Sequence, residues 1–114
     1  MLIKSHQLGD ILDNLFQNSI KFLKNSNTKK IRIELYKESP KIIIKFSNSG
    51  TKIEHDQWEK IFEQGYSGSK STGLGLFSSR EVLKKYGGRI FIQNSNSNET
   101  SFIIELNEGV INKN

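Results

Sequence analysis

The sequence predicts an α+β fold, a two-layer α/β sandwich in which helices lie on one face of a sheet. Helical spacing of apolar residues in residues 8–23 and 76–86 predicts two long helices. Each of these helices precedes two short segments in which apolar and polar residues alternate, and such segments predict strands. The chain has 114 residues, which is enough for one core of this kind and little more.

The first half of the chain reads as a helix followed by a hairpin. The helix presents one apolar face, formed by Leu8, Ile11, Leu12, Leu15, Phe16, Ile20 and Leu23. Asn25-Ser-Asn27 breaks this pattern. Residues 31–36 and 42–46 alternate as half-buried strands do, and a proline-containing turn at residues 38–41 joins them.

The second half repeats this order. A loop at residues 47–52 leads to a short helix at residues 55–62, whose apolar face consists of Trp58, Ile61 and Phe62. The next helix ends at Gly87-Gly88, because glycine is preferred just after a helix C-terminus. Two further strands, joined by a polar turn, complete the pattern at residues 89–93 and 101–106.

The composition excludes several kinds of site. There is no cysteine, which excludes disulfides and thiolate metal sites, and His6 and His55 have no partners at metal-ligand spacing. No apolar run approaches the ~20 residues of a membrane span. We therefore expect a cytoplasmic chain, or the cytoplasmic part of a membrane sensor, with no direct membrane contact. The net charge of +5 is spread over lysines interspersed with glutamates, which favours a solvated surface over nucleic-acid binding.

A glycine-rich loop at residues 67–76 leads directly into the second long helix. Gly73 and Gly75 let backbone N–H groups approach a ligand closely, and the positive end of the helix dipole favours a phosphate there. Upstream, Asn14 and Asn18 are four residues apart and so share one side of the first helix. Neutral oxygen donors of this kind suit a magnesium ion carried by phosphates. Together these features indicate a nucleotide site.

The order of these motifs resembles the ATP-binding domain of sensor histidine kinases, in the GHKL (Bergerat-fold) superfamily. The resemblance runs from Leu8 to Leu106, and its most specific parts are residues 11–22 (ILDNLFQNSIKF) and 71–76 (STGLGL). It implies three helices on one face of a mostly antiparallel mixed sheet. It also implies a domain at residues 1–107 with a C-terminal tail at residues 108–114.

The resemblance further implies that ATP is the substrate and Mg²⁺ the cofactor. Asn18 matches the residue that holds Mg²⁺, Asn14 lies one turn earlier, and Lys21 matches a lysine that reaches the phosphates; these three are the catalytic candidates. Residues 66–72 match a short lid over the triphosphate. Aromatic candidates are also typical core residues, and lysine candidates are also typical of solvated surfaces. The ATP-binding candidates implied in this way are Asn14, Asn18, Lys21, Phe22, Asn48, Gly50, Ile53, Phe62, Tyr66, Ser69, Lys70, Ser71, Thr72, Gly73, Leu74, Gly75 and Leu76.

Three departures from the family pattern bear on the site. Asn48 stands where the family has the aspartate that accepts a hydrogen bond from the adenine amino group. A neutral acceptor is worth about 1 kcal/mol less than a charged one, so weaker ATP binding is expected. Because a carboxamide can also donate, we hypothesise relaxed discrimination between adenine and guanine. Lys52 replaces a glycine and so alters the loop's path, and Ser71 replaces the first glycine of the phosphate-facing motif.

The chemistry expected is phosphoryl transfer to an external histidine. Related ATPases carry a glutamate at the position of Asn14, and a carboxamide cannot act as a general base for water. His6 and His55 both lie outside the family's acceptor context, so the resemblance implies a histidine-bearing dimerisation domain of the same or a partner kinase, with a response regulator downstream. An isolated domain of this kind is expected to be monomeric. Two alternatives stay open: a degenerate interaction module with weak or no nucleotide binding, and a serine kinase of the anti-sigma type.

Overall fold

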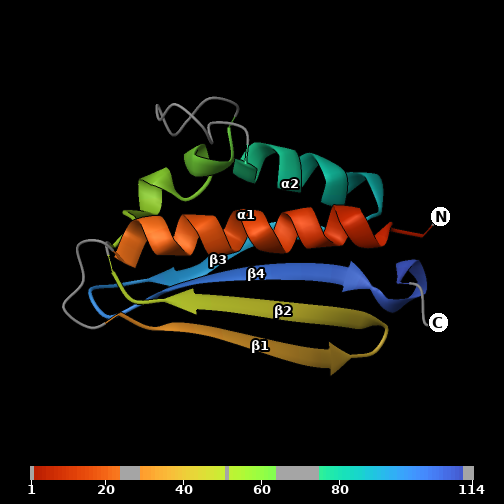
Figure 1. Cartoon of the computed structure of the whole chain (residues 1–114), viewed down its shortest axis with the longest axis horizontal. Coiled ribbons are helices and arrows are strands. Elements are labelled where there is room, and N and C mark those ends of the chain that lie inside the picture. The colour runs from red at the N-terminus through yellow and green to blue at the C-terminus, as the bar shows by residue number, and fades with distance from the viewer. Residues whose placement is uncertain (1, 24–28, 51, 64–74, 112–114) are drawn as a thin grey trace.

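The computed structural model describes residues 2–23, 29–50, 52–63 and 75–111, and it confirms the predicted two-layer α/β sandwich (Figure 1). In these described ranges, two α-helices and four strands follow one another in the predicted order, together with three 3-10 turns. In chain order these elements are α1 (Ser5–Leu23), β1 (Ile31–Glu38), β2 (Lys41–Asn48), η1 (His55–Gln57), η2 (Lys60–Phe62), α2 (Gly75–Lys85), β3 (Arg89–Ser95), β4 (Thr100–Asn107) and η3 (Glu108–Val110).

The sheet has the order β1-β2-β4-β3, so the last strand of the chain lies at the centre beside β2. All three strand pairings of the described residues are antiparallel, so the parallel pairing implied by a mixed sheet is not found in this part of the chain. Both α-helices lie on the same face of the sheet (Figure 1). α1 packs against α2 and β2, while α2 packs against β3 and η2. β1 is therefore left as an outer strand beside the helix layer.

The core lies between the helices and the sheet. Ile11 and Leu15 of α1 are buried one turn apart, as the helical pattern predicts. Phe46 of β2 and Phe102 of β4 are directly opposite each other in the ladder and are both buried beneath them. Two residues of the predicted apolar face, Phe16 and Ile20, are instead exposed, because α1 covers the sheet only as far as β2.

The short helix predicted at residues 55–62 is two successive 3-10 turns, η1 and η2. The amides of Gln57 and Trp58 bond three residues back, to the carbonyls of Glu54 and His55. The indole N–H of Trp58 donates to the Ile53 carbonyl at 2.9 Å, which ties this turn to the segment that precedes it. The segment is thus held in a tight turn rather than extended into a regular α-helix.

Residues 108–111 pack against the domain core. Val110 and Ile111 contact the buried cluster, and the Val110 carbonyl accepts a hydrogen bond from the Ile3 amide at 2.8 Å. The Glu108 amide donates to the Pro40 carbonyl at 2.7 Å, which joins this turn to the β1–β2 connection. The boundary expected after residue 107 stays a prediction. No helix in the described ranges is long and apolar enough to span a membrane.

Candidate functional site

Asn14 connects α1 to the first turn of α2. Its side-chain nitrogen donates to the Gly75 carbonyl and to the Ser79 hydroxyl, at 3.1 Å in each case. Ser79 is buried, and its hydroxyl also donates to the Gly75 carbonyl at 3.0 Å. A Cβ atom at Gly75 would lie 3.8 Å from the Asn14 carboxamide, which is ordinary van der Waals contact. Gly75 therefore matters here through its carbonyl, and Asn14 holds the start of α2 against α1.

Asn18 lies one turn after Asn14 on α1, and its side-chain nitrogen is buried without a hydrogen-bond partner among the described residues. A buried polar atom without a partner costs about 1–3 kcal/mol, so such atoms are rare in folded proteins. The side-chain nitrogen of Asn18 is therefore available to donate a hydrogen bond to a bound group. Asn18 thus fits a residue that engages a bound group.

Asn48 ends β2 and is fully buried, with 1% of its surface exposed. Its nitrogen donates to the Ser49 carbonyl at 2.8 Å, and its oxygen accepts a longer bond from the Ser19 hydroxyl at 3.4 Å. Ser19 directly follows Asn18, so α1 brings the two predicted asparagine positions close to each other. The loop then continues through Gly50, whose φ of 124° favours glycine.

The orientation of Asn48 bears on the predicted purine preference. Turning its carboxamide would place an oxygen against the Ser49 carbonyl oxygen and remove the 2.8 Å hydrogen bond. That loss is worth about 1 kcal/mol. In the observed orientation the Asn48 oxygen is the accepting atom of the carboxamide, and it accepts from the Ser19 hydroxyl at 3.4 Å. The relaxed discrimination between adenine and guanine hypothesised from the sequence stays a prediction, to which this hydrogen bond adds a cost for the turned carboxamide.

A chain of small polar side chains supports the Asn48 end of the sheet. Thr100 lies directly opposite Asn48 in the β2–β4 ladder and is buried. Its hydroxyl is 2.5 Å from that of Ser95, which in turn accepts the Ile53 amide at 2.8 Å. The sequence reasoning did not identify Ser19, Ser79, Ser95 or Thr100. Ser19 carried a usable signal, since it continues the i, i+4 series of Ile11 and Leu15 and so places a hydroxyl at a core position.

Phe62 is a core residue in this structure. It is buried and packs edge-on against Phe102, with ring centroids 6.3 Å apart. The Arg80 guanidinium lies 4.6 Å from the centre of the Phe62 ring and forms an ion pair with Glu59 at 2.7 Å. This packing fixes α2 against η2. Contact of Phe62 with a nucleotide stays a prediction.

The other predicted residues divide into described and undescribed positions. Ile53 is buried, Leu76 is half-buried in the first turn of α2, and Lys21 is exposed on the last turn of α1. The remaining candidates lie outside the described residues, as does the side chain of Phe22; they are Tyr66, Ser69, Lys70, Ser71, Thr72, Gly73 and Leu74.

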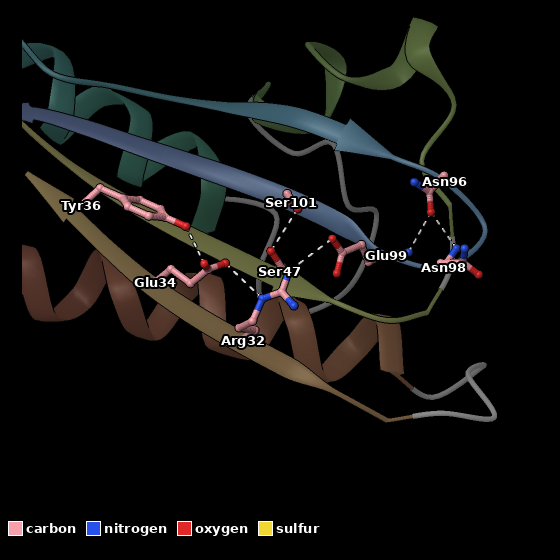
Figure 2. Close-up of polar contacts among 8 residues, drawn as sticks. All are labelled: Arg32, Glu34, Tyr36, Ser47, Asn96, Asn98, Glu99 and Ser101. Carbon is pink, nitrogen blue, oxygen red and sulfur yellow. Dashed lines mark hydrogen bonds and ion pairs between the residues drawn. The ribbon is translucent and has the colours of Figure 1, made fainter. Parts of the chain in front are cut away.

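Among the described residues, the groups with perturbed pKa values lie on the open face of the sheet, the face away from α1 and α2. Figure 2 shows Glu34 between Tyr36 and Arg32 on this face, with Arg32 reaching toward Glu99. The hydrogen bond from the Tyr36 hydroxyl lowers the pKa of Glu34 and raises that of Tyr36, and Arg32 lowers the Glu34 pKa further. Ser47 and Ser101, also drawn in Figure 2, join β2 to β4 at 3.0 Å.

A second charged group on the open face centres on Glu105. Hydrogen bonds from the Arg89 guanidinium lower its pKa most, and Lys41 adds to this effect. Arg89 also lies 4.4 Å from the centre of the Phe91 ring. These groups stabilise the sheet on the side away from α1 and α2. They are structural charges rather than parts of the candidate site.

A family model described as histidine kinase-, DNA gyrase B- and HSP90-like ATPase matches residues 3–110. The methanogenesis regulatory histidine kinase FilI of Methanothrix harundinacea is 29% identical over 103 residues, which cover 88% of this chain and 12% of that protein. The sensor histidine kinase GlrK of Escherichia coli is 28% identical over 106 residues, which cover 87% of this chain and 22% of that protein. The chain thus spans less than a quarter of the length of these relatives.

Solved structures agree with this match. The nucleotide-free catalytic domain of histidine kinase ThkA superposes with a TM-score of 0.79 at 30% identity, covering 90% of this chain and 67% of that one. A structure of ThkA in complex with the response regulator TrrA matches with a TM-score of 0.71 at 30% identity, covering 89% of this chain and 28% of that one.

Proposed function

The chain belongs to the histidine kinase-, DNA gyrase B- and HSP90-like ATPase family as a histidine kinase catalytic domain, and on this basis we propose that it binds ATP together with Mg²⁺ at α1. The bound nucleotide would lie between the start of α2 and the end of β2. In the parent protein the domain would transfer the γ-phosphoryl group to a histidine on a separate dimerisation domain.

The buried, unpartnered side-chain nitrogen of Asn18 carries the nucleotide part of this proposal, because an amide N–H group is a donor that suits a phosphate oxygen, whereas Mg²⁺ would be held by the oxygen of the same carboxamide. Its neighbours on α1 are already engaged, Asn14 with Gly75 and Ser79, and Ser19 with Asn48. A polar group that the fold leaves unsatisfied, between two groups that it satisfies, supports a role in binding a ligand rather than in holding the domain together.

The donor set suits magnesium brought by phosphates. No group of three or more histidine, cysteine, aspartate or glutamate side chains in the described ranges could hold a metal by itself. Mg²⁺ keeps waters and phosphate oxygens as ligands and needs only one or two from the protein. The Asn18 carboxamide oxygen would supply such a ligand, and the ion would neutralise phosphate charge.

Other residues would orient the nucleotide. Lys21 follows Asn18 by three residues on α1 and is exposed, so its ammonium group can approach a phosphate. The N-terminus of α2 favours negative charge, and Asn14 holds that end in place. The Asn48 oxygen would accept from the adenine amino group. Asn14 has no basic carboxylate to offer water, which favours transfer to another nucleophile over hydrolysis.

The roles of the parent protein are part of the same proposal, because this chain spans only a small part of its relatives. The acceptor histidine would lie on a dimerisation domain of the same or a partner kinase. A response regulator would receive the phosphoryl group next, which is consistent with the ThkA complex with TrrA. We propose that this occurs in the cytoplasm, where ATP is available.

The first test is calorimetric titration of the chain with a non-hydrolysable ATP analogue, with and without Mg²⁺. We expect magnesium-dependent binding in the micromolar to low-millimolar range. Asn18→Ala should remove the magnesium dependence, whereas Gln17→Ala, an exposed carboxamide on the same helix, should leave it unchanged. Absence of binding at several millimolar would contradict the proposal and favour a degenerate interaction module.

Phosphoryl transfer needs its own assay. The chain should phosphorylate a supplied histidine-bearing dimerisation domain and give an acid-labile product, since phosphohistidine hydrolyses in acid and phosphoserine does not. Alone, the chain should not label His6 or His55. An acid-stable product would instead indicate a serine kinase.

A further inference from the structure

Four exposed apolar side chains form a strip along one side of the molecule, between α1 and the outer strand β1. Phe16 and Ile20 of α1 are 42% and 39% exposed, and Ile33 and Leu35 of β1 are 56% and 70% exposed. We call these four residues the edge patch. β1 is the edge of the sheet that both helices leave uncovered (Figure 1). Edges of this kind are usually protected in soluble proteins, because they can pair with another strand.

The four side chains share one face. Ile33 and Leu35 lie opposite Phe46 and Ile44 in the ladder, and both of these β2 residues are buried under the helix layer. Opposite residues of an antiparallel pair point to the same side of the sheet, so Ile33 and Leu35 point toward the helices.

Phe16 and Ile20 lie on the flank of α1 that faces away from α2. Each follows a buried residue, Ile11 or Leu15, by five positions, which is about 140° around the helix in one direction. Asn14, which contacts α2, follows Ile11 by three positions and lies about 60° away in the other direction. The flank that carries Phe16 and Ile20 therefore borders β1.

The backbone of β1 presents hydrogen-bonding groups at the same positions. The Ser49 amide donates to the Lys30 carbonyl at 3.0 Å, which marks Lys30–Ser49 as a hydrogen-bonded pair. Bonded and non-bonded pairs alternate in an antiparallel ladder, so the even-numbered residues of β1 bond to β2. The N–H and C=O groups of the odd-numbered residues, including Ile33 and Leu35, then point away from the sheet. An added strand would satisfy these groups and cover the edge patch, whereas a docked helix would only cover the patch.

We propose that β1 pairs in antiparallel fashion with β1 of a second copy of this chain, about a two-fold axis at Ile33. In this register Arg32 of each copy faces Glu34 of the other on the open face, so the ion pair that Arg32 and Glu34 form within each chain at 3.0 Å continues across the junction. On the helix face Ile33 meets Ile33, and Ile31 meets Leu35. The strand is thus complementary to itself in charge, in apolar contact and in hydrogen bonding.

Neighbouring registers are less favourable. An axis at Leu35 would place Arg32 opposite Glu38 but the apolar Ile33 opposite the charged Lys37, and an axis at Glu34 would place the two Glu34 carboxylates opposite each other. Opposed like charges are destabilising in a sheet. The axis at Ile33 joins the two four-stranded sheets into one continuous sheet, with both copies of α1 on the same side. Phe16 and Ile20 of each copy then flank the new junction.

A dimer held by one strand pair and a small apolar strip belongs to the weak class of interfaces, typically below ~1,200 Å². We therefore expect a dissociation constant in the micromolar range. A weak dimer differs from the monomer that the family resemblance implied. The proposed dimer does not depend on the proposed nucleotide function.

The test is sedimentation of the 114-residue chain over a concentration series. We expect a reversible monomer–dimer equilibrium, and Leu35→Lys should raise the dissociation constant at least tenfold. Leu2→Lys, at an exposed apolar residue outside the edge patch, should not change it. Circular dichroism verifies that each variant is folded. A monomer at millimolar concentration, or a dimer that Leu35→Lys leaves unchanged, would overturn the proposal.

Charge exchange tests the register. Arg32→Glu and Glu34→Arg should each weaken self-association, because like charges would then face each other. An equimolar mixture of the two single variants should form a heterodimer, since every 32–34 pair regains opposite charges. The double variant Arg32→Glu/Glu34→Arg should recover self-association. Failure of both the mixture and the double variant to recover it would refute the Ile33 axis.

Discussion

The link from Asn14 to the first turn of α2 should be measurable as stability. Asn14→Ala removes two hydrogen bonds of 3.1 Å, to the Gly75 carbonyl and to the Ser79 hydroxyl. At about 0.5–1.5 kcal/mol each, their loss should lower the free energy of unfolding by about 1–3 kcal/mol. Ser79 retains its own bond to Gly75 at 3.0 Å, so the lower half of this range is expected.

A double-mutant cycle isolates the Asn14–Ser79 bond. Asn14→Ala, Ser79→Ala and the double variant should be compared by urea denaturation. The two residues are in contact, so the double variant should lose less than the sum of the singles, by about 0.5–1.5 kcal/mol. Asn14→Asp keeps the shape but cannot donate, and it should be at least as damaging as Asn14→Ala.

Gln17→Ala is the matched control for this cycle. It removes an exposed carboxamide from the same helix, so it shares the gain in helix propensity without the loss of these bonds. We expect its effect to stay within about 0.5 kcal/mol. If Asn14→Ala lowers the free energy of unfolding by no more than Gln17→Ala does, the hydrogen bonds of Asn14 to α2 do not stabilise the fold as expected.

Three further predictions follow from the geometry. Titrating ATP and GTP side by side should show a preference for ATP, because turning the Asn48 carboxamide costs its bond to Ser49; equal affinities would contradict the observed orientation. Arg89 holds the pKa of Glu105, whose side chain is 14% exposed, below its usual value. The Glu105 carboxylate therefore stabilises the fold at pH values above the pKa of the unfolded state, and this contribution is lost as the pH falls through the pKa of the folded state. The stability difference between the native chain and Glu105→Gln should therefore shrink between pH 7 and pH 3 in urea denaturation, and a constant difference would argue against the ion pair. Gly88→Ala would place a Cβ atom 2.5 Å from the Glu105 carbonyl oxygen and should lower the free energy of unfolding by about 1–3 kcal/mol or more. Gly9→Ala, with no atom within 4 Å of the added Cβ, should instead stabilise α1 by up to about 1 kcal/mol in thermal unfolding. A similar loss of stability in both variants would show that the close approach at Gly88 is not the cause.

Local pattern was sufficient to predict the elements. The spacing of Ile11 and Leu15 predicted α1, and the alternation in residues 31–36 and 42–46 predicted the β1–β2 hairpin, because helical and strand periodicities are properties of neighbouring residues. Gly87-Gly88 likewise indicated where α2 ends. The 3-10 geometry of η1 and η2 was not predicted, since the indole bond from Trp58 back to Ile53 is a contact that periodicity does not encode.

The candidate site was predicted as a set of residue types but not as an arrangement. Asn14 and Asn18 were placed on one side of α1 by their spacing, yet their surroundings differ: Asn14 bonds to α2, while the Asn18 nitrogen has no partner among the described residues. Ser19 and Ser79 entered only through the structure, because their partners lie 29 and 65 residues away in the chain.

The sequence by itself determined the order of helices and strands, the family to which the chain belongs, and the residue types available for a nucleotide and Mg²⁺. Only the tertiary structure decided which of those side chains are already engaged in hydrogen bonds within the fold. It also decided that Phe16 and Ile20, apolar and correctly spaced, are exposed beside β1. The physical reason is that periodicity records which residues share a face of one element, whereas burial and hydrogen bonding depend on which other element covers that face.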